Sequence, residues 1–360
     1  MTFQLARLVT KENGAAPVLY PSFELSKSTG VAAHSLSIRL SMSQNSGADY
    51  KVRVTPRYTV ISDSFRSTQV LHAVGIVFLP FVGTVCAVIF AFTMRFGAIE
   101  IVLFTMLYVF SILGITAGYH RHFAHRSYST RPAIRFVLGV LGSMAAQGPV
   151  IYWVSNHRRH HRFSDREGDP HSPHGSGESA RSGLPGFLHA HMGWTLDREI
   201  TNTAVFAKDL LRDPMAMRLN HTYYLWVIMG LAVPCVLGGL LTQSGAGAVS
   251  GFLWGGLVRL FVSYHSTNSI NSIAHLFGSR PFDTPEKSRN NVWLVLPTLG
   301  EGLHNNHHAF PDSAFFGHHW WHFDLGSWLI LLLERLGLAW HIHKPRASVI
   351  EAKRRQSGAV

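Results

Sequence analysis

The stretch that decides the fold is Tyr152-Trp153-Val154-Ser155-Asn156-His157-Arg158-Arg159-His160-His161-Arg162-Phe163. On a helix, spacings of three and four residues place His157, His160 and His161 on one face. The same spacing recurs at His304, His307 and His308. Another cluster, the first along the chain, contains His120 and His125. One such triplet could belong to a basic surface helix. Three clusters beside apolar segments instead predict metal ligands.

Composition points to a membrane protein rather than two soluble domains. Only 14% of the 360 residues are charged and 47% are hydrophobic, so a minority of the chain carries the net charge of +12. Such a concentrated basic surface suits anionic lipid headgroups or an acidic partner. No nucleic-acid-binding motif is present, so nucleic acid is not an expected partner. Cys86 and Cys235 lie inside apolar runs and predict packing residues, not a disulfide framework.

Four apolar runs are long enough to cross the ~30 Å hydrocarbon core of a bilayer. They cover residues 71–93, 98–118, 223–241 and 246–264, which makes two hairpins. The turns within the hairpins carry one Arg at most, whereas the middle region is rich in Arg. The positive-inside rule therefore places both termini and the histidines on the cytoplasmic side. The predicted fold is an all-α integral membrane protein, with a cytoplasmic helical cap that holds a His-rich dimetal site.

The remaining segments divide the chain into a polar tail (1–66), a membrane domain (67–345) and a short C-terminal tail (346–360). The start shows no signal peptide. Residues 133–150 predict a helix in the membrane interface or packed under the cap, and 175–186 an exposed Gly- and Ser-rich loop. Residues 325–340 predict an amphipathic helix resting on the membrane.

The histidine pattern resembles that of the membrane fatty acyl desaturases. His-x4-His followed by two His-x2-His-His words is typical of that family. Between about residues 70 and 345, the neighbouring words are similar to its stearoyl-CoA (delta-9) branch: Gly118-Tyr119-His120-Arg121, Asp169-Pro170-His171, Asn271-Ser272-Ile273-Ala274-His275 and Gly300-Glu301-Gly302. The resemblance implies that His275 is a ninth ligand and that Asn271 holds a metal-bound water.

Nine imidazoles exceed what one metal accepts, so the count predicts two metals. Imidazole suits iron, zinc, copper and nickel, and ligand type alone does not name the metal. The resemblance implies two irons, with O2 as co-substrate. Ligating histidines commonly donate their second ring nitrogen to a carboxylate, and Glu301, Asp165, Asp169 and Asp312 are candidates. Six further histidines are expected to lie outside the metal shell: His122, His171, His174, His318, His319 and His322.

His120 and His125 lie five residues apart, roughly 140° around an α-helix. They can share a face only if the helix ends or unwinds between them. We expect this first cluster where the second span leaves the membrane.

A site at the ends of apolar spans can admit a lipid tail. The helical face below His120 contains Thr116, Ile112, Tyr108 and Phe104, which could line an acyl tunnel with the aromatic pair as its floor. Ordinary helix packing is the alternative. The resemblance implies that Gln147 and Trp153 bend the tunnel and so select a cis geometry. Arg259, inside the fourth span, could reach the cap or the site.

Gly148-Pro149 and Val154-Ser155-Asn156 depart from the animal acyl-CoA branch where the carrier would bind. The carrier of the fatty acyl group therefore stays open between CoA, acyl carrier protein and a membrane lipid.

No flavin, nicotinamide or fused cytochrome motif is present. Electrons are therefore expected from a separate ferredoxin- or cytochrome-type donor that docks at Arg158, Arg159 and Arg162.

The predicted function is an O2-dependent desaturase that introduces a cis double bond at the delta-9 position of a saturated acyl chain. A di-iron hydroxylase or ketolase shares the histidine pattern and is the first alternative. A His-rich metal transporter is a more distant one, because it would need polar residues within the spans.

Overall fold

The computed structural model describes residues 39–41, 53–55, 58–93, 96–174, 182–356 and 358, and it divides the chain into Met1–Arg57 and Tyr58–Val360. In the first unit, strands β1 (Arg39–Ser41) and β2 (Arg53–Thr55) pair antiparallel. The second unit begins before the expected boundary at residue 67, because β3 (Thr59–Val60) pairs with β5 (Ile200–Thr201). The rest of the expected N-terminal tail up to residue 57 lies outside the described residues.

Four helical segments of the second unit are long and apolar enough to cross a membrane: Arg66–Thr93, Ala98–Ala124, Tyr223–Thr242 and Gly245–Leu276. They comprise α1 (Asp63–Thr93), α2 (Ala98–Leu113) with η1 (Gly114–Ala124), α8 (Tyr223–Thr242), and α9 (Gly245–Gly251) with η5 (Phe252–Val258) and α10 (Arg259–Leu276). The predicted four-span helical fold is confirmed. The second and fourth spans continue beyond their predicted ends at residues 118 and 264.

The outer surface of the spans is apolar, as a lipid-facing surface must be. Phe92 is 87% exposed and Leu71 is 75% exposed, both on α1. Cys86, which we expected to be a packing residue, is also exposed there.

Two of the spans contain π-helical segments, η1 and η5, wound more widely than an α-helix. η1 packs against the short apolar helix α3 (Pro132–Met144). A Cβ atom on Gly114 would lie 2.1 Å from the backbone nitrogen of Gly142, so the two backbones approach as closely as glycine permits. Helix α3 thus packs against the spans.

Arg259 is fully buried where several helices meet. Its guanidinium donates hydrogen bonds to Ser111 Oγ at 2.9 Å and to the carbonyl oxygens of Gly255 (2.8 Å), Met144 (2.8 Å) and Gly230 (3.1 Å). An unsatisfied cation at this depth would be costly, so these contacts explain how the span tolerates the charge. Arg259 therefore holds helices together and does not reach the histidines.

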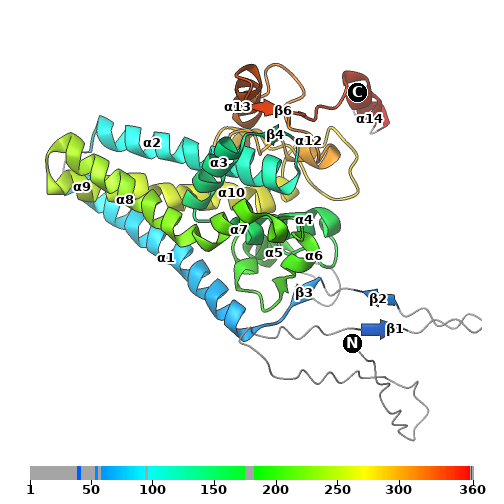
Figure 1. Ribbon diagram of the computed structural model, residues 1–360, viewed down its shortest axis with the longest axis horizontal. Helices are drawn as coiled ribbons and strands as arrows, with labels where there is room; N and C mark the ends of the chain where they lie inside the picture. The colour runs from blue at the N-terminus through cyan, green and yellow to red at the C-terminus, as the bar shows by residue number, and fades with distance from the viewer. Residues whose placement is uncertain are drawn as a thin grey trace, which may run out of the picture. The chain divides into compact units, whose positions relative to one another are not determined.

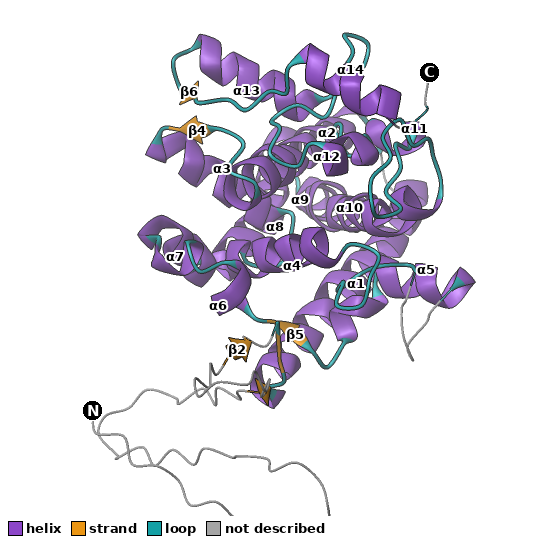
Figure 2. Ribbon diagram, turned by 90° about the vertical axis from the view of Figure 1, so that its right-hand side faces the viewer, coloured by secondary structure: helices purple, strands orange, loops and turns teal. Residues whose placement is uncertain are grey.

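The cap is built from short helices between and after the two hairpins (Figures 1 and 2). Its elements are α4 (Val150–Phe163), α5 (Gly183–His191), η3 (Gly193–Leu196), α6 (Thr203–Phe206), η4 (Leu210–Arg212), α7 (Pro214–His221), α11 (Val292–Val295), α12 (His304–Ala309), α13 (Leu325–Arg335) and α14 (Ala347–Gln356). Strand β4 (Ser129–Thr130) pairs with β6 (Ala339–Trp340). In Figure 1, α12 and α14 lie at the opposite end of this unit from the α8–α9 turn.

Three sequence-based expectations change in the cap. The predicted loop 175–186 gives up its last residues to α5, and residues 175–181 lie outside the described part. The predicted amphipathic helix ends at Arg335, and the chain then forms β6. The expected C-terminal tail contains α14, held by a 2.6 Å hydrogen bond from Lys353 Nζ to the carbonyl oxygen of Ala309.

Candidate metal centre

The first histidine cluster lies on the π-helical turns of η1. The backbone nitrogen of His125 donates to the carbonyl oxygen of His120 at 3.1 Å, a five-residue interval. A π-helix repeats this interval, so two residues five apart face the same way. We expected the helix to end or unwind between these histidines. It does end at Ala124, just before His125, but its turns are already widened ahead of that end.

The other seven histidines come from three helices. His157, His160 and His161 share one face of α4, and His304, His307 and His308 lie on the short helix α12. His275 lies at the last turn of α10, beyond the apolar part of the span. The short spacing on α4 and α12 explains why two small helices can supply six ligands.

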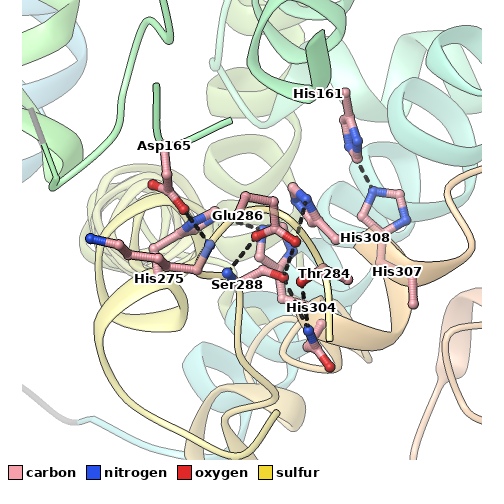
Figure 3. Close-up of polar contacts among 12 residues, drawn as sticks. His161, Asp165, His275, Thr284, Glu286, Ser288, His304, His307 and His308 are labelled. Atoms are coloured by element: carbon pink, nitrogen blue, oxygen red, sulfur yellow. Dashed lines mark hydrogen bonds and ion pairs between the residues drawn. The ribbon is translucent and has the colours of Figure 1, made fainter. Parts of the chain in front are cut away.

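The nine predicted ligands converge into two groups, within each of which the ligand atoms lie within 4.8 Å of one another. The first group is His120, His125, His157, His161 and His307; the second is His160, His275, His304 and His308. In the first, Nε2 of His307 lies 3.0 Å from Nε2 of His120 and 2.9 Å from Nε2 of His161. In the second, Nε2 of His275 and His304 are 3.0 Å apart (Figure 3).

Carboxylates contact the far ring nitrogen, Nδ1, of four of these histidines. Glu301 contacts His120, Asp169 lies 3.0 Å from His160, Asp165 lies 2.8 Å from His275, and Glu286 lies 3.6 Å from His308. Such contacts fix the ring orientation and leave Nε2 free for a metal. Asp312, the fourth predicted carboxylate, is exposed on the surface instead. Glu286, which was not among the candidates, takes the fourth position.

Burial keeps most of these rings neutral, which is the form that binds a metal. Burial holds the pKa of six rings well below the usual range, and the repulsion that neighbouring protonated rings would exert lowers it further. These rings belong to His125, His157, His161, His304, His307 and His308. His160 differs: burial lowers its pKa, but the carboxylates of Asp169, Asp165 and Glu286 together outweigh burial and raise the pKa overall.

The facing nitrogens fit a metal better than they fit hydrogen bonds to one another. Where Nδ1 of a neutral ring donates to a carboxylate, Nε2 carries a lone pair. Nε2 of His160 and of His308 face each other in this way at 3.4 Å. Neighbouring ligands bound at ~2.1 Å to one metal are about 3 Å apart. The donor set therefore fits two cations, each held mainly by imidazole nitrogen.

Three charged or titratable groups at the site escaped the sequence-based prediction. Glu286 lies in a stretch without histidines. His171 was expected to lie outside the site, yet its ring stacks on that of His160 with centroids 4.5 Å apart. Arg121 is fully buried and contacts Glu301 at 3.1 Å and Asp324 at 2.7 Å. The only sequence signal for Arg121 was its place beside a ligand.

Of the predicted substrate and water-holding residues, Trp153 contacts a candidate ligand, and Gln147 and Asn271 form hydrogen bonds with residues of α10. The Trp153 ring stacks on His157 with centroids 5.0 Å apart, and Gln147 Nε2 donates to Thr267 Oγ1 at 2.8 Å. Asn271, one turn before His275 on α10, donates to Asn268 Oδ1 at 3.3 Å. All three predicted residues are half-buried.

Further down the second span, Phe104 stacks on Tyr108, and Tyr108 and Ile112 pack with Leu299. The Tyr108 hydroxyl donates to the carbonyl oxygen of Pro297 at 2.6 Å. Thr116, above Ile112 on the same span, is fully buried and bonded to Glu301.

Two of the three arginines predicted to dock an electron donor are internal. Arg159 is 7% exposed and donates to the carbonyl oxygen of Gly168 at 2.7 Å. Arg158 is half-buried and contacts both carboxylate oxygens of Asp209, at 2.7 and 3.0 Å. Arg162 alone is exposed. The prediction of a docking surface at these residues is wrong, because the residues between the ligands of α4 point into the cap.

A polar cavity of about 220 Å³ lies beside the second histidine cluster. Its lining includes Tyr152, Asn156, Arg159, Asp169, Trp194 and Arg198. Asp169 lines this cavity and also contacts His160, so the cavity lies next to the second group of candidate ligands.

Four apolar spans capped by two groups of histidines are the arrangement of an integral-membrane protein with a candidate dimetal centre. The chain belongs to the fatty acid desaturase family, whose model matches residues 98–341. That membership sets the metal-transporter alternative aside.

Three relatives illustrate the range of the family. The chain is 43% identical over 298 residues to the hex-5-enoyl-[acyl-carrier protein] acetylenase of Moorena producens (strain JHB), covering 82% of this chain and 93% of the relative. It is 37% identical over 232 residues to the sn-1 stearoyl-lipid 9-desaturase of Anabaena variabilis, covering 64% and 78%. It is 34% identical over 285 residues to a probable acyl-CoA desaturase of Schizosaccharomyces pombe (strain 972 / ATCC 24843), covering 78% and 55%.

Proposed function

We propose that this protein is an O2-dependent di-iron desaturase that introduces a cis double bond at the delta-9 position of a saturated acyl chain. The observation that carries the proposal is the convergence of nine buried histidines into two groups at the ends of apolar spans. The termini and this site are proposed to lie on the cytoplasmic side.

Two irons, when bound, would supply the activation of O2 needed to remove hydrogen from an unactivated methylene. The first would be held by His120, His125, His157, His161 and His307, and the second by His160, His275, His304 and His308. Asn271 would contribute through a water. The four outer carboxylates keep the rings oriented before any metal binds, which reduces the reorganisation that binding requires.

The chain's other residues would position the substrate. The Trp153 ring lies against the rings of His120 and His157 in the first group, where it would press the acyl chain toward the metals. Gln147, held by Thr267, would fix the bend that selects a cis product. Phe104, Tyr108 and Ile112 would close the far end, since the Tyr108 hydroxyl ties the second span to Pro297.

The polar cavity beside Asp169 supports a thioester substrate. CoA and acyl carrier protein both present the acyl group on a pantetheine arm, whose amides can hydrogen-bond. Asn156 and Arg159 line the cavity with matching polar groups. The name of the Moorena producens relative, which specifies an acyl carrier protein, favours that carrier over CoA.

The same relative favours a second candidate function, formation of a triple bond from an existing double bond. An acetylenase uses the same oxidation on an alkene, so the metal site does not distinguish the two reactions. They differ in whether the acyl chain that the enzyme accepts is saturated or already carries a double bond.

Expression in a desaturase-deficient host, followed by gas chromatography–mass spectrometry of total fatty acids, tests the proposal. Purified enzyme is then given matched acyl-carrier-protein, acyl-CoA and phospholipid substrates. Stearoyl and palmitoyl chains should yield cis-9 monoenes, with the acyl-carrier-protein substrate converted fastest.

Alkynes formed only from alkenoyl substrates would replace desaturation by acetylenase activity. Hydroxylated or keto products would identify the oxygen-inserting alternative. A lack of any product from an iron-loaded preparation would contradict the proposal.

A further inference from the structure

The segment Phe316–His322 and helix α14 form an aromatic and basic surface. Trp320 is 89% exposed and Trp321 is 60% exposed. Trp321 stacks on His319 with ring centroids 4.4 Å apart, and the Arg354 guanidinium lies 3.1 Å from Nε2 of His319. We call Trp320, Trp321, Arg354 and Arg355 the Trp–Arg surface.

This surface lies a short distance along the chain from the first metal group. The Phe316 ring is 4.4 Å from the His307 ring and 5.3 Å from the His120 ring, centroid to centroid. Trp320 lies four positions after Phe316, so their Cα atoms are at most ~14 Å apart. Electron transfer becomes slower with distance, and few residues are needed here to join exposed side chains to metal ligands.

A second series of rings leads from the same surface to the third histidine cluster. His318 lies 5.3 Å from Phe310 and 5.6 Å from Phe282, centroid to centroid. Phe310 follows the ligand His308 by two residues and ends α12. The segment thus contacts both the ligand-bearing helix and the aromatic residues that support it.

Position and charge indicate an acidic protein rather than the bilayer as the partner. In Figure 1, α14 lies at the end of the unit opposite the α8–α9 turn, away from the membrane-crossing part of the spans. Within α14, Lys353, Arg354 and Arg355 outnumber Glu351. Exposed tryptophan beside arginine is the composition that interfaces favour.

We propose that the Trp–Arg surface is where a small acidic one-electron carrier docks to reduce the metal site, an inference that rests on the proposed desaturase function. Each turnover removes two hydrogens from the acyl chain and reduces one O2 to two waters. Two protons come from solvent, and two reduced carriers each lose one electron.

Anaerobic stopped-flow measurements test the docking without requiring acyl substrate. The oxidised iron-loaded enzyme is mixed with a reduced plant-type ferredoxin or reduced cytochrome b5, and the rate of carrier oxidation is followed. The variants are R354E/R355E and W320A/W321A, with R162E and W293A as matched exposed controls outside the surface. Dithionite, which needs no docking surface, reduces each variant in parallel.

We expect the second-order rate with at least one carrier to fall on the order of tenfold in R354E/R355E at low salt, because charge mainly sets encounter rates. The wild-type rate should fall with added salt, and the variant should respond less. W320A/W321A should lower the rate at all salt concentrations. R162E, W293A and the conservative R354K and W320F variants should resemble the wild type.

Equal iron content and equal dithionite rates show that a variant is folded. Unchanged rates with both carriers in folded R354E/R355E and W320A/W321A would overturn the inference. So would normal carrier rates combined with strong quenching, by spin-labelled lipids, of tryptophan fluorescence that is lost in reconstituted W320A/W321A, which would assign the tryptophans to the bilayer. Because carrier oxidation is measured without acyl substrate, these outcomes are separate from failure to form a double bond.

Discussion

Glu301 links His120 of the first group to the buried Arg121. Its carboxylate contacts His120 Nδ1, Arg121 Nη1 and Thr116 Oγ1. Burial alone would raise the pKa of Glu301, but His120 and Arg121 outweigh burial and lower it, so the carboxylate stays ionised. An ionised partner makes the imidazole a stronger metal ligand.

Glu301→Gln keeps the shape of the side chain and removes its charge. We expect metal affinity at the first group to fall by roughly 10–100-fold, the usual effect of removing such an outer partner. Turnover should fall with it. Metal titration of the purified variant checks this, and Asp312→Asn, an exposed carboxylate change, should behave like the wild type. An unaltered metal affinity in Glu301→Gln would show that the charge of Glu301 is not needed for metal binding at the first group.

Tyr108 gives a test of the tunnel floor. Tyr108→Ala would open space below the metals, and each extra buried methylene contributes ~0.8 kcal/mol. Preference should therefore move toward longer acyl chains by a few-fold. Tyr108→Phe removes only the hydroxyl contacts to Pro297 and Ser266 and should keep the wild-type chain length. Competition assays with C14 to C20 substrates measure both, and identical product profiles would place the floor elsewhere.

Helical spacing was enough to predict the candidate ligands from sequence, and three of the four outer carboxylates were also named as candidates, but Glu286 was not. His157, His160 and His161 are neighbours on one helix whatever the tertiary fold. Glu286 approaches His308 only after the chain between α10 and α12 has folded back. Arg158 and Arg159 looked like a charged surface for the same reason: spacing assigns residues to faces of a helix but does not reveal what covers each face.

At the level of elements, η1 determines whether the first cluster can form. A separation of five residues indicated that a regular α-helix could not bring both histidines to one face, but spacing alone does not distinguish a helix that ends from one that widens into a π-helix. The wider winding depends on tertiary contact, since Gly114 lies against Leu141 and Gly142 of α3.

Gly114→Ala tests that contact. The added methyl would overlap the backbone of α3, and overpacking of this kind typically costs 1–3 kcal/mol. We expect a lower thermal unfolding temperature and a loss of metal from the first group before the second. Gly75→Ala is the matched control, since no atom lies within 4 Å of its added Cβ and alanine favours the helix. Equal unfolding temperatures for the two variants would mean that η1 does not depend on α3.

For the whole molecule, the two hairpins predict one orientation in the membrane. Both free cysteines lie inside spans, so a cysteine-free background is simple to make. A single cysteine at Ser244, in the α8–α9 turn, should react with an impermeant maleimide only from outside intact cells. A cysteine at Gln356, the last residue of α14, should react only after the membrane is opened. Labelling of both positions from the same side would contradict the hairpin topology.

The central claim is that nine histidines form two separate metal sites in one chain. The most direct measurement is the metal-to-protein ratio of active, purified enzyme, determined by inductively coupled plasma mass spectrometry. We expect two irons per chain in the wild type and one in His304→Ala, because only the second group loses a ligand. A fully active enzyme with a single iron, or a His304→Ala variant that keeps both irons and full turnover, would contradict it.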